Sequence, residues 1–274
     1  MLDLLEITIL AQIILETLPV SSSAHVFIAK EFFQNYATGT KMLPSKELTE
    51  LLNLPTLLVV GFFFRKRIIS LLKLVIQALK SWKITTRAII ITRIIGYAIL
   101  INSITYAAYL LKNSFIQHSP SPHIVLLGLV ASMSFIFSLK WKQDLQNSPL
   151  TLSKAILIGL AQSLSLVPGI SRFGTTYVAA RWLNLAPKRA FEFSFLLHAM
   201  LSVGLAVKTI ALSGPFLSII TPLLTTTNLL IITPATLISY AGLSLSWKLA
   251  VQRVFWHFGA YYLIPVVLLL LNFK

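Results

Sequence analysis

The chain has 274 residues, of which 56% are hydrophobic and only 11% are charged. Globular domains carry about 25% charged residues, so this composition excludes a soluble enzyme and indicates an integral membrane protein. The chain contains no cysteine, which excludes disulfide bonds and thiolate metal sites.

The net charge of +15 raises the question of a nucleic-acid partner. Eight lysines and arginines, however, lie between positions 65 and 93, beside apolar segments. This pattern is typical of cytoplasmic loops that contact anionic lipid headgroups. We therefore expect membrane lipids, and no nucleic acid, among the partners of the chain.

Six segments are apolar over a length that can cross the membrane, because a transmembrane helix needs about 20 apolar residues. Two further apolar segments each contain a proline within a polar stretch, and we expect each of them to enter the membrane and turn back. The predicted fold class is therefore all-α, with about six transmembrane helices and two re-entrant helical hairpins. The predicted crossings are 48–64, 88–111, 124–139, 191–212, 228–247 and 255–273, and the predicted hairpins are 2–33 and 155–180.

The charged loops set the orientation of these segments. The basic segment 65–87 is predicted to be cytoplasmic, which makes the first hairpin enter from the outer side and the second from the cytoplasm. Two hairpins of opposite orientation predict an inverted-topology repeat within one membrane domain, 1–274, with a first repeat of about 1–111 and a second of about 124–274. Broken helices in such proteins meet near the middle of the bilayer, where a polar break must be covered or line a wet cavity. We therefore expect one polar site built from both hairpins.

The polar stretch of the first hairpin contains Gln12 and Glu16. An ionisable residue at membrane depth is a functional candidate by default, so Glu16 is a candidate catalytic residue; a helix cap or a partner for a buried arginine is the alternative. Gln12 lies one helical turn earlier on the same face. The two side chains offer oxygen ligands to a hard cation such as Mg²⁺ or Ca²⁺, and phosphate oxygens would have to complete so small a set.

The same stretch continues with Ser22 and His25. A serine, a histidine and a carboxylate together can activate a nucleophile or transfer protons. We expect Ser22 to be the nucleophile with Glu16 or His25 as its base, and attack by a water held by His25 is the alternative. His25 also fits the role of a hydrogen-bonded packing residue. His198, in the middle of a predicted crossing, is a candidate supporting residue.

The polar stretch of the second hairpin, 168–176, reads Pro-Gly-Ile-Ser-Arg-Phe-Gly-Thr-Thr. Backbone N–H groups at a helix start attract anions, and the guanidinium of Arg172 fits a phosphate through two hydrogen bonds. The hydroxyls of Ser171, Thr175 and Thr176 add donors to this predicted phosphate site. An arginine that snorkels to the interface is the alternative, but snorkelling does not require the flanking proline, glycine and serine. The substrate that matches both stretches has a phosphate head and a lipid tail.

In these stretches the chain resembles the undecaprenyl-diphosphate phosphatases, the bacitracin-resistance proteins of bacterial membranes. The resemblance covers essentially the whole chain. The segments that carry it are Gln12–Glu16, Leu18–His25, Pro168–Thr176, Arg189–Ala190 and Glu192–Leu197.

Three positions depart from the pattern of that family. Gln12 replaces the commoner glutamate, which weakens the case for a metal. Ala24 replaces a glycine, which is expected to restrict the turn before His25. Phe173 replaces a serine, which removes one hydroxyl from the phosphate site.

The resemblance implies hydrolysis of undecaprenyl diphosphate to undecaprenyl phosphate and phosphate, which recycles the lipid carrier of peptidoglycan synthesis and confers bacitracin resistance. It also implies a divalent cation, Mg²⁺ or Ca²⁺, and a site on the periplasmic side of the bacterial inner membrane. The sequence leaves a homodimer open. The functional positions that the resemblance transfers to this chain are Glu16, Ser22, His25, Ser171, Arg172 and Thr176.

A membrane transporter or flippase of a lipid phosphate is the alternative function, because inverted repeats and broken helices are common in carriers. The other superfamily of lipid phosphatases is excluded by its motifs. The chain has no Lys-x6-Arg-Pro sequence, and the histidine and aspartate that follow the arginine in that superfamily do not follow Arg172.

Overall fold

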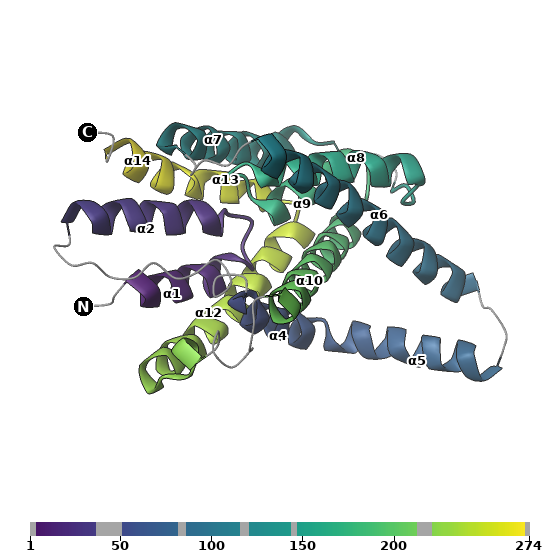
Figure 1. Cartoon of the computed structure of the whole chain (residues 1–274). Coiled ribbons are helices and arrows are strands. Elements are labelled where there is room, and N and C mark those ends of the chain that lie inside the picture. The colour runs from purple at the N-terminus through teal and green to yellow at the C-terminus, as the bar shows by residue number, and fades with distance from the viewer. Residues whose placement is uncertain are drawn as a thin grey trace.

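The computed structural model describes residues 4–36, 51–81, 86–115, 121–143, 147–212 and 221–271 (Figure 1). Within these ranges the regular structure is helical and contains no strand, which confirms the all-α prediction. The α-helices are α1 (Leu4–Leu15), α2 (Ser22–Tyr36), α4 (Asn53–Phe63), α5 (Arg65–Ser81), α6 (Thr86–Phe115), α7 (Pro122–Ser138), α8 (Leu152–Ser163), α9 (Arg172–Trp182), α10 (Pro187–Leu212), α12 (Thr226–Val251), α13 (Phe258–Tyr261) and α14 (Leu263–Leu271). The 3-10 helices are η1 (Leu139–Trp141), η2 (Leu164–Leu166), η3 (Thr221–Leu224) and η4 (Phe255–His257).

Four of the described helices, α6, α7, α10 and α12, are long and apolar enough to cross a membrane. They coincide with the predicted crossings at 88–111, 124–139, 191–212 and 228–247. The other two predicted crossings, whose ends lie partly outside the described residues, look different. Residues 53–63 form α4, which has 11 residues and is about 16 Å long, roughly half of the hydrocarbon core. The last crossing is divided among η4, α13 and α14.

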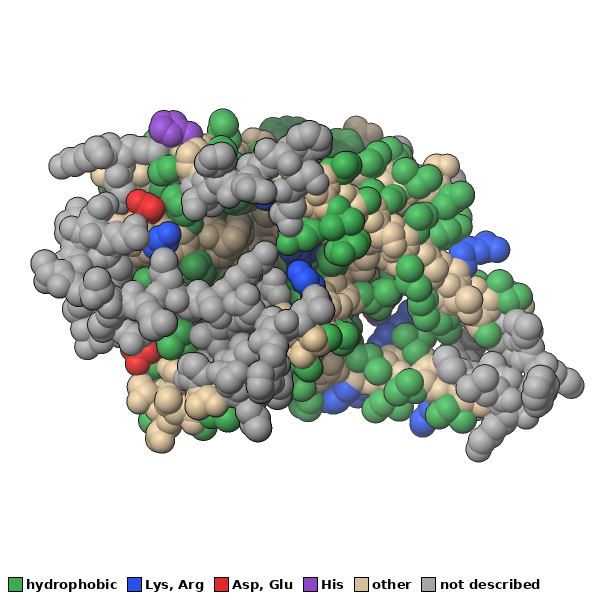
Figure 2. Space-filling model, in the orientation of Figure 1, with side chains coloured by type: hydrophobic (Ala, Val, Ile, Leu, Met, Phe, Trp, Pro, Cys, Tyr) green, Lys and Arg blue, Asp and Glu red, His purple; other side chains and the backbone are tan. Residues whose placement is uncertain are grey.

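The outer surfaces of the long helices are apolar. Figure 2 shows hydrophobic side chains over much of the part of this face that is drawn in colour. Leu127 on α7 and Leu230 on α12, for example, are 69% and 70% exposed. Soluble monomers rarely expose large contiguous apolar surfaces. Together with the long apolar helices, this surface indicates a multi-pass membrane protein.

Each polar stretch lies at the break between two helices, α1 and α2 in the first hairpin and α8 and α9 in the second (Figure 1). A serine caps the second helix in both cases. Ser21 Oγ accepts a hydrogen bond from the N–H of Ala24 (3.4 Å), and Ser171 Oγ accepts one from Gly174 (3.1 Å). Such caps satisfy backbone donors that have no partner within the helix. The two breaks therefore end in the same local structure.

This capping changes the correspondence between the two motifs. Spacing from the prolines pairs Ser22 with Ser171, whereas the caps pair Ser21 with Ser171. A glutamine lies nine residues before the capping serine in both hairpins, which supports the second alignment. Ser22 then corresponds to Arg172, because each is the first residue of its helix.

Each hairpin packs against a long helix from the other half of the chain. α1 lies against α12, and α8 lies against α6. The hydroxyl of Thr17 donates to the backbone oxygen of Ser239 on α12 (3.1 Å), and Gln162 Nε2 donates to Asn102 Oδ1 on α6 (2.9 Å). Two repeats of opposite orientation would pack in this way, with the hairpin of each repeat against a long helix of the other. The repeat boundaries and the orientation of the repeats in a membrane stay predictions.

The turn that leads into α9 depends on a glycine. Gly169 has a φ of +95°, a conformation that L side chains rarely adopt. It also lies directly on α7, where a Cβ added to Gly169 would collide with the backbone oxygen of Val125. Ser132 of α7 holds the turn, because its hydroxyl donates to the Gly169 oxygen (3.1 Å) and accepts from the N–H of Ser171 (2.9 Å).

We therefore expect Gly169→Ala to destabilise the protein by at least about 1–3 kcal/mol, since it adds backbone strain to a steric collision. Thermal unfolding in detergent is the measurement. Gly61→Ala is the matched control, because a Cβ at Gly61 in α4 would meet nothing within 4 Å. Equal unfolding temperatures for the two variants would contradict the close approach of the turn to α7.

Candidate active site

Glu16 follows α1, and several polar side chains contact its carboxylate. Its Oε1 accepts a hydrogen bond from the hydroxyl of Ser22 (2.7 Å) and another from Gln12 Nε2 (2.8 Å). Its Oε2 lies 3.4 Å from Nε2 of His198 on α10. The helix break reverses the chain between Glu16 and Ser22, which brings the hydroxyl back to the carboxylate. The structure thus places Gln12, Glu16 and Ser22 together.

His25, by contrast, does not contact this carboxylate. Its Nδ1 is 2.7 Å from the backbone oxygen of Ser21, and its Nε2 is 2.9 Å from the hydroxyl of Tyr261. The two rings are also stacked, with centroids 5.7 Å apart. Both nitrogens of His25 therefore have partners, and the side chain has the contacts of a packing residue.

The second motif divides into groups that are already bonded and groups that are not. The hydroxyl of Ser171 caps α9, and the hydroxyl of Thr176 donates to the backbone oxygens of Arg172 and Phe173, each at 3.0 Å. Within the described part of the chain, Arg172 Nε and Thr175 Oγ1 are buried and have no hydrogen-bond partner. A buried polar atom without a partner costs free energy. Arg172 and Thr175 are therefore the groups of this motif that remain available to an anion.

Two residues connect the motifs. The hydroxyl of Tyr262 donates to the backbone oxygen of Pro19 in the first motif (2.8 Å), and the same phenolic oxygen interacts with Ser171 in the second. His198 lies close enough to both Glu16 and Arg172 to interact with their charges. The structure therefore links the two helix breaks through Tyr262 and His198, and a single functional site built from both stays a prediction.

Three residues of this site are not among the candidates that the sequence identifies. They are Asn53, whose Oδ1 accepts a hydrogen bond from Gln12 Nε2 (3.2 Å), and the two tyrosines at 261 and 262. Tyrosine is common in membrane proteins near the interface, so a tyrosine in the sequence does not by itself indicate a functional residue. Asn53 is a polar residue inside an apolar segment, the signal that identifies His198 as a candidate, and that signal could have identified Asn53 as well.

The side chains present fit a divalent cation poorly. Glu16 is the one carboxylate near the site among the described residues, and Gln12 turns its NH₂ group toward that carboxylate. No group of three or more His, Cys, Asp or Glu side chains that could hold a metal occurs within the described ranges. Hard cations prefer six or more oxygen ligands, and Arg172 adds a positive charge nearby. The cation at Gln12 and Glu16 that the resemblance implies stays a prediction, and this ligand set does not favour it.

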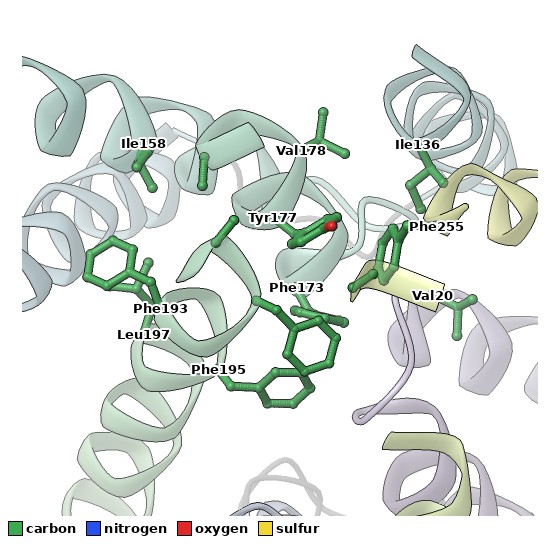
Figure 3. Packing of buried hydrophobic residues seen from close by; sticks show 14 of the residues in the cluster. Val20, Ile136, Ile158, Phe173, Tyr177, Val178, Phe193, Phe195, Leu197 and Phe255 are labelled. Carbon is green, nitrogen blue, oxygen red and sulfur yellow. The ribbon is translucent and has the colours of Figure 1, made fainter. Parts of the chain in front are cut away.

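The structure also explains two of the departures from the family pattern. Ala24 is buried inside α2, where its backbone is helical and a glycine is not needed. The expectation that Ala24 restricts a turn is therefore wrong. The ring of Phe173 is buried among aromatic residues, 4.3 Å from Phe195 and 5.9 Å from Phe255 between centroids (Figure 3). Position 173 thus contributes packing, beside the phosphate motif.

The chain is similar in sequence to a family of known proteins. The model of the family "Bacitracin resistance protein BacA" matches residues 7–268. An undecaprenyl-diphosphatase of Geotalea daltonii is 32% identical over 222 residues, which is 75% of this chain and 75% of the relative. Relatives of the same name from Saccharophagus degradans and Acinetobacter baumannii are 29% and 27% identical, over 80% and 70% of this chain and 77% and 67% of theirs. The chain therefore belongs to the BacA family of bacitracin resistance proteins.

Proposed function

We propose that this chain hydrolyses undecaprenyl diphosphate to undecaprenyl phosphate and phosphate. The observation that carries the proposal is the 2.7 Å hydrogen bond from the hydroxyl of Ser22 to the carboxylate of Glu16, together with Arg172 Nε of the other motif, which is buried without a hydrogen-bond partner among the described residues. A hydroxyl beside a base, close to a cation that can hold phosphate, is the arrangement that nucleophilic displacement at phosphorus needs. The names of the relatives agree with this reaction and give the transporter alternative no support.

In the proposed mechanism, Ser22 Oγ attacks the terminal phosphorus while its proton passes to Glu16. The bond from that phosphorus to the bridging oxygen breaks, and undecaprenyl phosphate leaves with the electron pair and takes the proton from Glu16. Water then attacks the phosphoserine and gives its proton to Glu16. The bond from phosphorus to Ser22 Oγ breaks, Glu16 returns the proton to Ser22, and phosphate departs.

Most of the rate enhancement in such a reaction comes from placement and charge stabilisation. The guanidinium of Arg172, the hydroxyl of Thr175 and the N-terminal N–H groups of α9 are the groups proposed to hold the terminal phosphate. Ser171 and Thr176 are proposed to support this grip through their bonds to the start of α9.

Glu16 is the better-supported base for Ser22. It accepts the hydrogen bond from that hydroxyl directly, whereas both ring nitrogens of His25 are engaged by Ser21 and Tyr261. Direct attack by water, with Ser22 as a binding group, is the alternative mechanism, and the substitution Ser22→Ala distinguishes the two.

We expect Ser22→Ala to lower phosphate release by at least about 100-fold, as the loss of an activated nucleophile or its proton transfer does. The measurement is phosphate release by purified protein in detergent, where transport across a membrane cannot contribute. Undecaprenyl and farnesyl diphosphate serve as long and short substrates. Ser23→Ala is the matched control, because Ser23 is exposed and its hydroxyl reaches only that of Ser21 among the described hydrogen bonds. A small effect of Ser22→Ala would favour attack by water.

A second expectation concerns the phosphate grip. Arg172→Ala removes a partly buried charged group from the proposed anion site, which costs about 2–5 kcal/mol and lowers phosphate release by about 30- to several-thousand-fold. Arg172→Lys restores little activity, because a point charge cannot form two parallel hydrogen bonds with phosphate. Arg65→Ala, at an exposed arginine, is the control. Activity of Arg172→Ala close to that of the unmodified protein would refute the grip.

The proposed location is the bacterial inner membrane, with the site facing the periplasm. Segments predicted to be cytoplasmic lie together at one end of the bundle, which supports this orientation. Arg67 Nη2 is 3.8 Å from Glu192 Oε2, and the amino group of Lys188 lies 5.7 Å from the Trp247 ring centroid, around a cavity of about 490 Å³. Such a basic end suits the anionic headgroups of the cytoplasmic leaflet.

The orientation predicts a labelling pattern in this cysteine-free chain. Ser23→Cys, near the site, is expected to react with a membrane-impermeant thiol reagent added to intact protoplasts. Lys73→Cys, at an exposed position of α5, is expected to react only after the membrane is permeabilised. The opposite pattern would reverse the orientation and refute a site that faces the periplasm.

A further inference from the structure

His198 is a buried histidine whose nitrogens have no hydrogen-bond partner within the described residues. It lies in the apolar helix α10, is 3% exposed, and has the ring of Phe195 edge-on beside it at 6.4 Å between centroids. The polar group in contact with it is the carboxylate of Glu16, 3.4 Å from its Nε2. An imidazole is costly to bury without partners, so its place beside this carboxylate requires a reason.

The carboxylate itself has an uneven set of neighbours. The described hydrogen bonds of Glu16, from Gln12 and Ser22, both reach Oε1. Oε2 faces His198, and the charge of Arg172 also acts on His198. The imidazole thus fills the position from which a positive or hydrogen-donating group would hold Oε2.

A divalent cation would need the same position. A hard cation there would draw on Glu16 and on oxygen ligands around it, yet Gln12 offers its NH₂ group to the carboxylate and His198 supplies a nitrogen. A second carboxylate is absent from the described surroundings, and the guanidinium of Arg172 would repel a cation. The replacement of the family's glutamate by Gln12 and the presence of His198 therefore both disfavour a divalent cation at Glu16.

We propose that His198 takes the place of a divalent cation as the partner of Glu16, so that an imidazole holds this carboxylate against Ser22. His198 is then a positioning residue, which acts on the reaction through Glu16. The inference deepens the proposed function and rests on it for the reaction that Glu16 serves. It requires that phosphate release proceeds without a divalent ion.

The first test is kinetic. His198→Ala is expected to lower kcat by about 10- to 100-fold with little change in KM, because a base that is misplaced by about 1 Å loses that much rate. His198→Gln, which keeps an N–H donor, is expected to recover part of kcat. His257→Ala, at the exposed histidine that ends η4, is the matched control. Thermal unfolding verifies that each variant is folded, and an unchanged kcat for folded His198→Ala would overturn the proposal.

The second test measures metal binding directly. The unmodified protein is expected to release phosphate equally with and without EDTA and to bind no Mn²⁺ in electron paramagnetic resonance titrations. The double variant Gln12→Glu/His198→Ala, which replaces the imidazole with space and adds a second carboxylate, is expected to bind Mn²⁺ and to become sensitive to EDTA. Loss of activity of the unmodified protein in EDTA would overturn the proposal, whether Mn²⁺ binds the free protein or enters with the diphosphate.

The two failures can be told apart. If the unmodified protein releases no phosphate from any prenyl diphosphate, the proposed function fails. The Mn²⁺ titrations of the unmodified protein and of the double variant use no substrate, so they decide the inference in either case. Mn²⁺ binding by the unmodified protein, or none by the folded double variant, would refute the replacement of a cation by His198.

Discussion

A carboxylate among apolar helices needs polar partners. The arrangement of the site depends on the side chains that contact the carboxylate of Glu16. Desolvation makes an unpaired buried charge costly, and each neighbour of Glu16 offsets part of this cost from a different element. Gln12 comes from α1, Ser22 from α2 after the break, and His198 from α10. The surroundings of Glu16 are therefore complete only when the first hairpin and α10 are both in place.

Hydrogen bonding also divides the polar side chains of the two motifs into groups that hold the backbone and groups that remain available for the reaction. Ser21 and Ser171 are used as helix caps, so their hydroxyls hold the backbone of the breaks. The next residue in each motif, Ser22 or Arg172, is the first residue of its helix. A cap fixes the first turn of a helix, which fixes the direction of the side chain that follows it. The repeated local structure thus places two different chemical groups, a hydroxyl and a guanidinium, at the same position of their helices.

Much of this arrangement is visible in the sequence, and the rest is not, for physical reasons. Apolar length identifies α6, α7, α10 and α12, because a helix in hydrocarbon must satisfy its own backbone. The division of the last segment into η4, α13 and α14 depends on local packing that hydropathy averages away. Glu16, Ser22 and Arg172 are predictable, since polar groups beside prolines in apolar segments are rare.

Contacts between residues far apart in the sequence set the limit of such prediction. The partner of His25 is Tyr261, 236 residues away. A sequence shows that His25 is close to Ser22 along the chain, but in α2 the imidazole turns to Tyr261 and away from the Glu16 carboxylate. The role of Phe173 is hidden in the same way, because its aromatic neighbours come from α10 and from the start of the last segment.

The crossed packing of the two hairpins makes the order of assembly unequal for the two halves of the chain. When α8 emerges during synthesis, its partner α6 has already been made. α1, however, packs on α12, which begins roughly 210 residues after α1 ends. At about 5–20 residues per second, the first hairpin waits on the order of 10 to 40 seconds for its partner. During that interval its buried polar groups need lipid headgroups, water or an insertion factor as temporary partners, so the first hairpin is the part of this protein whose biogenesis depends most on its surroundings.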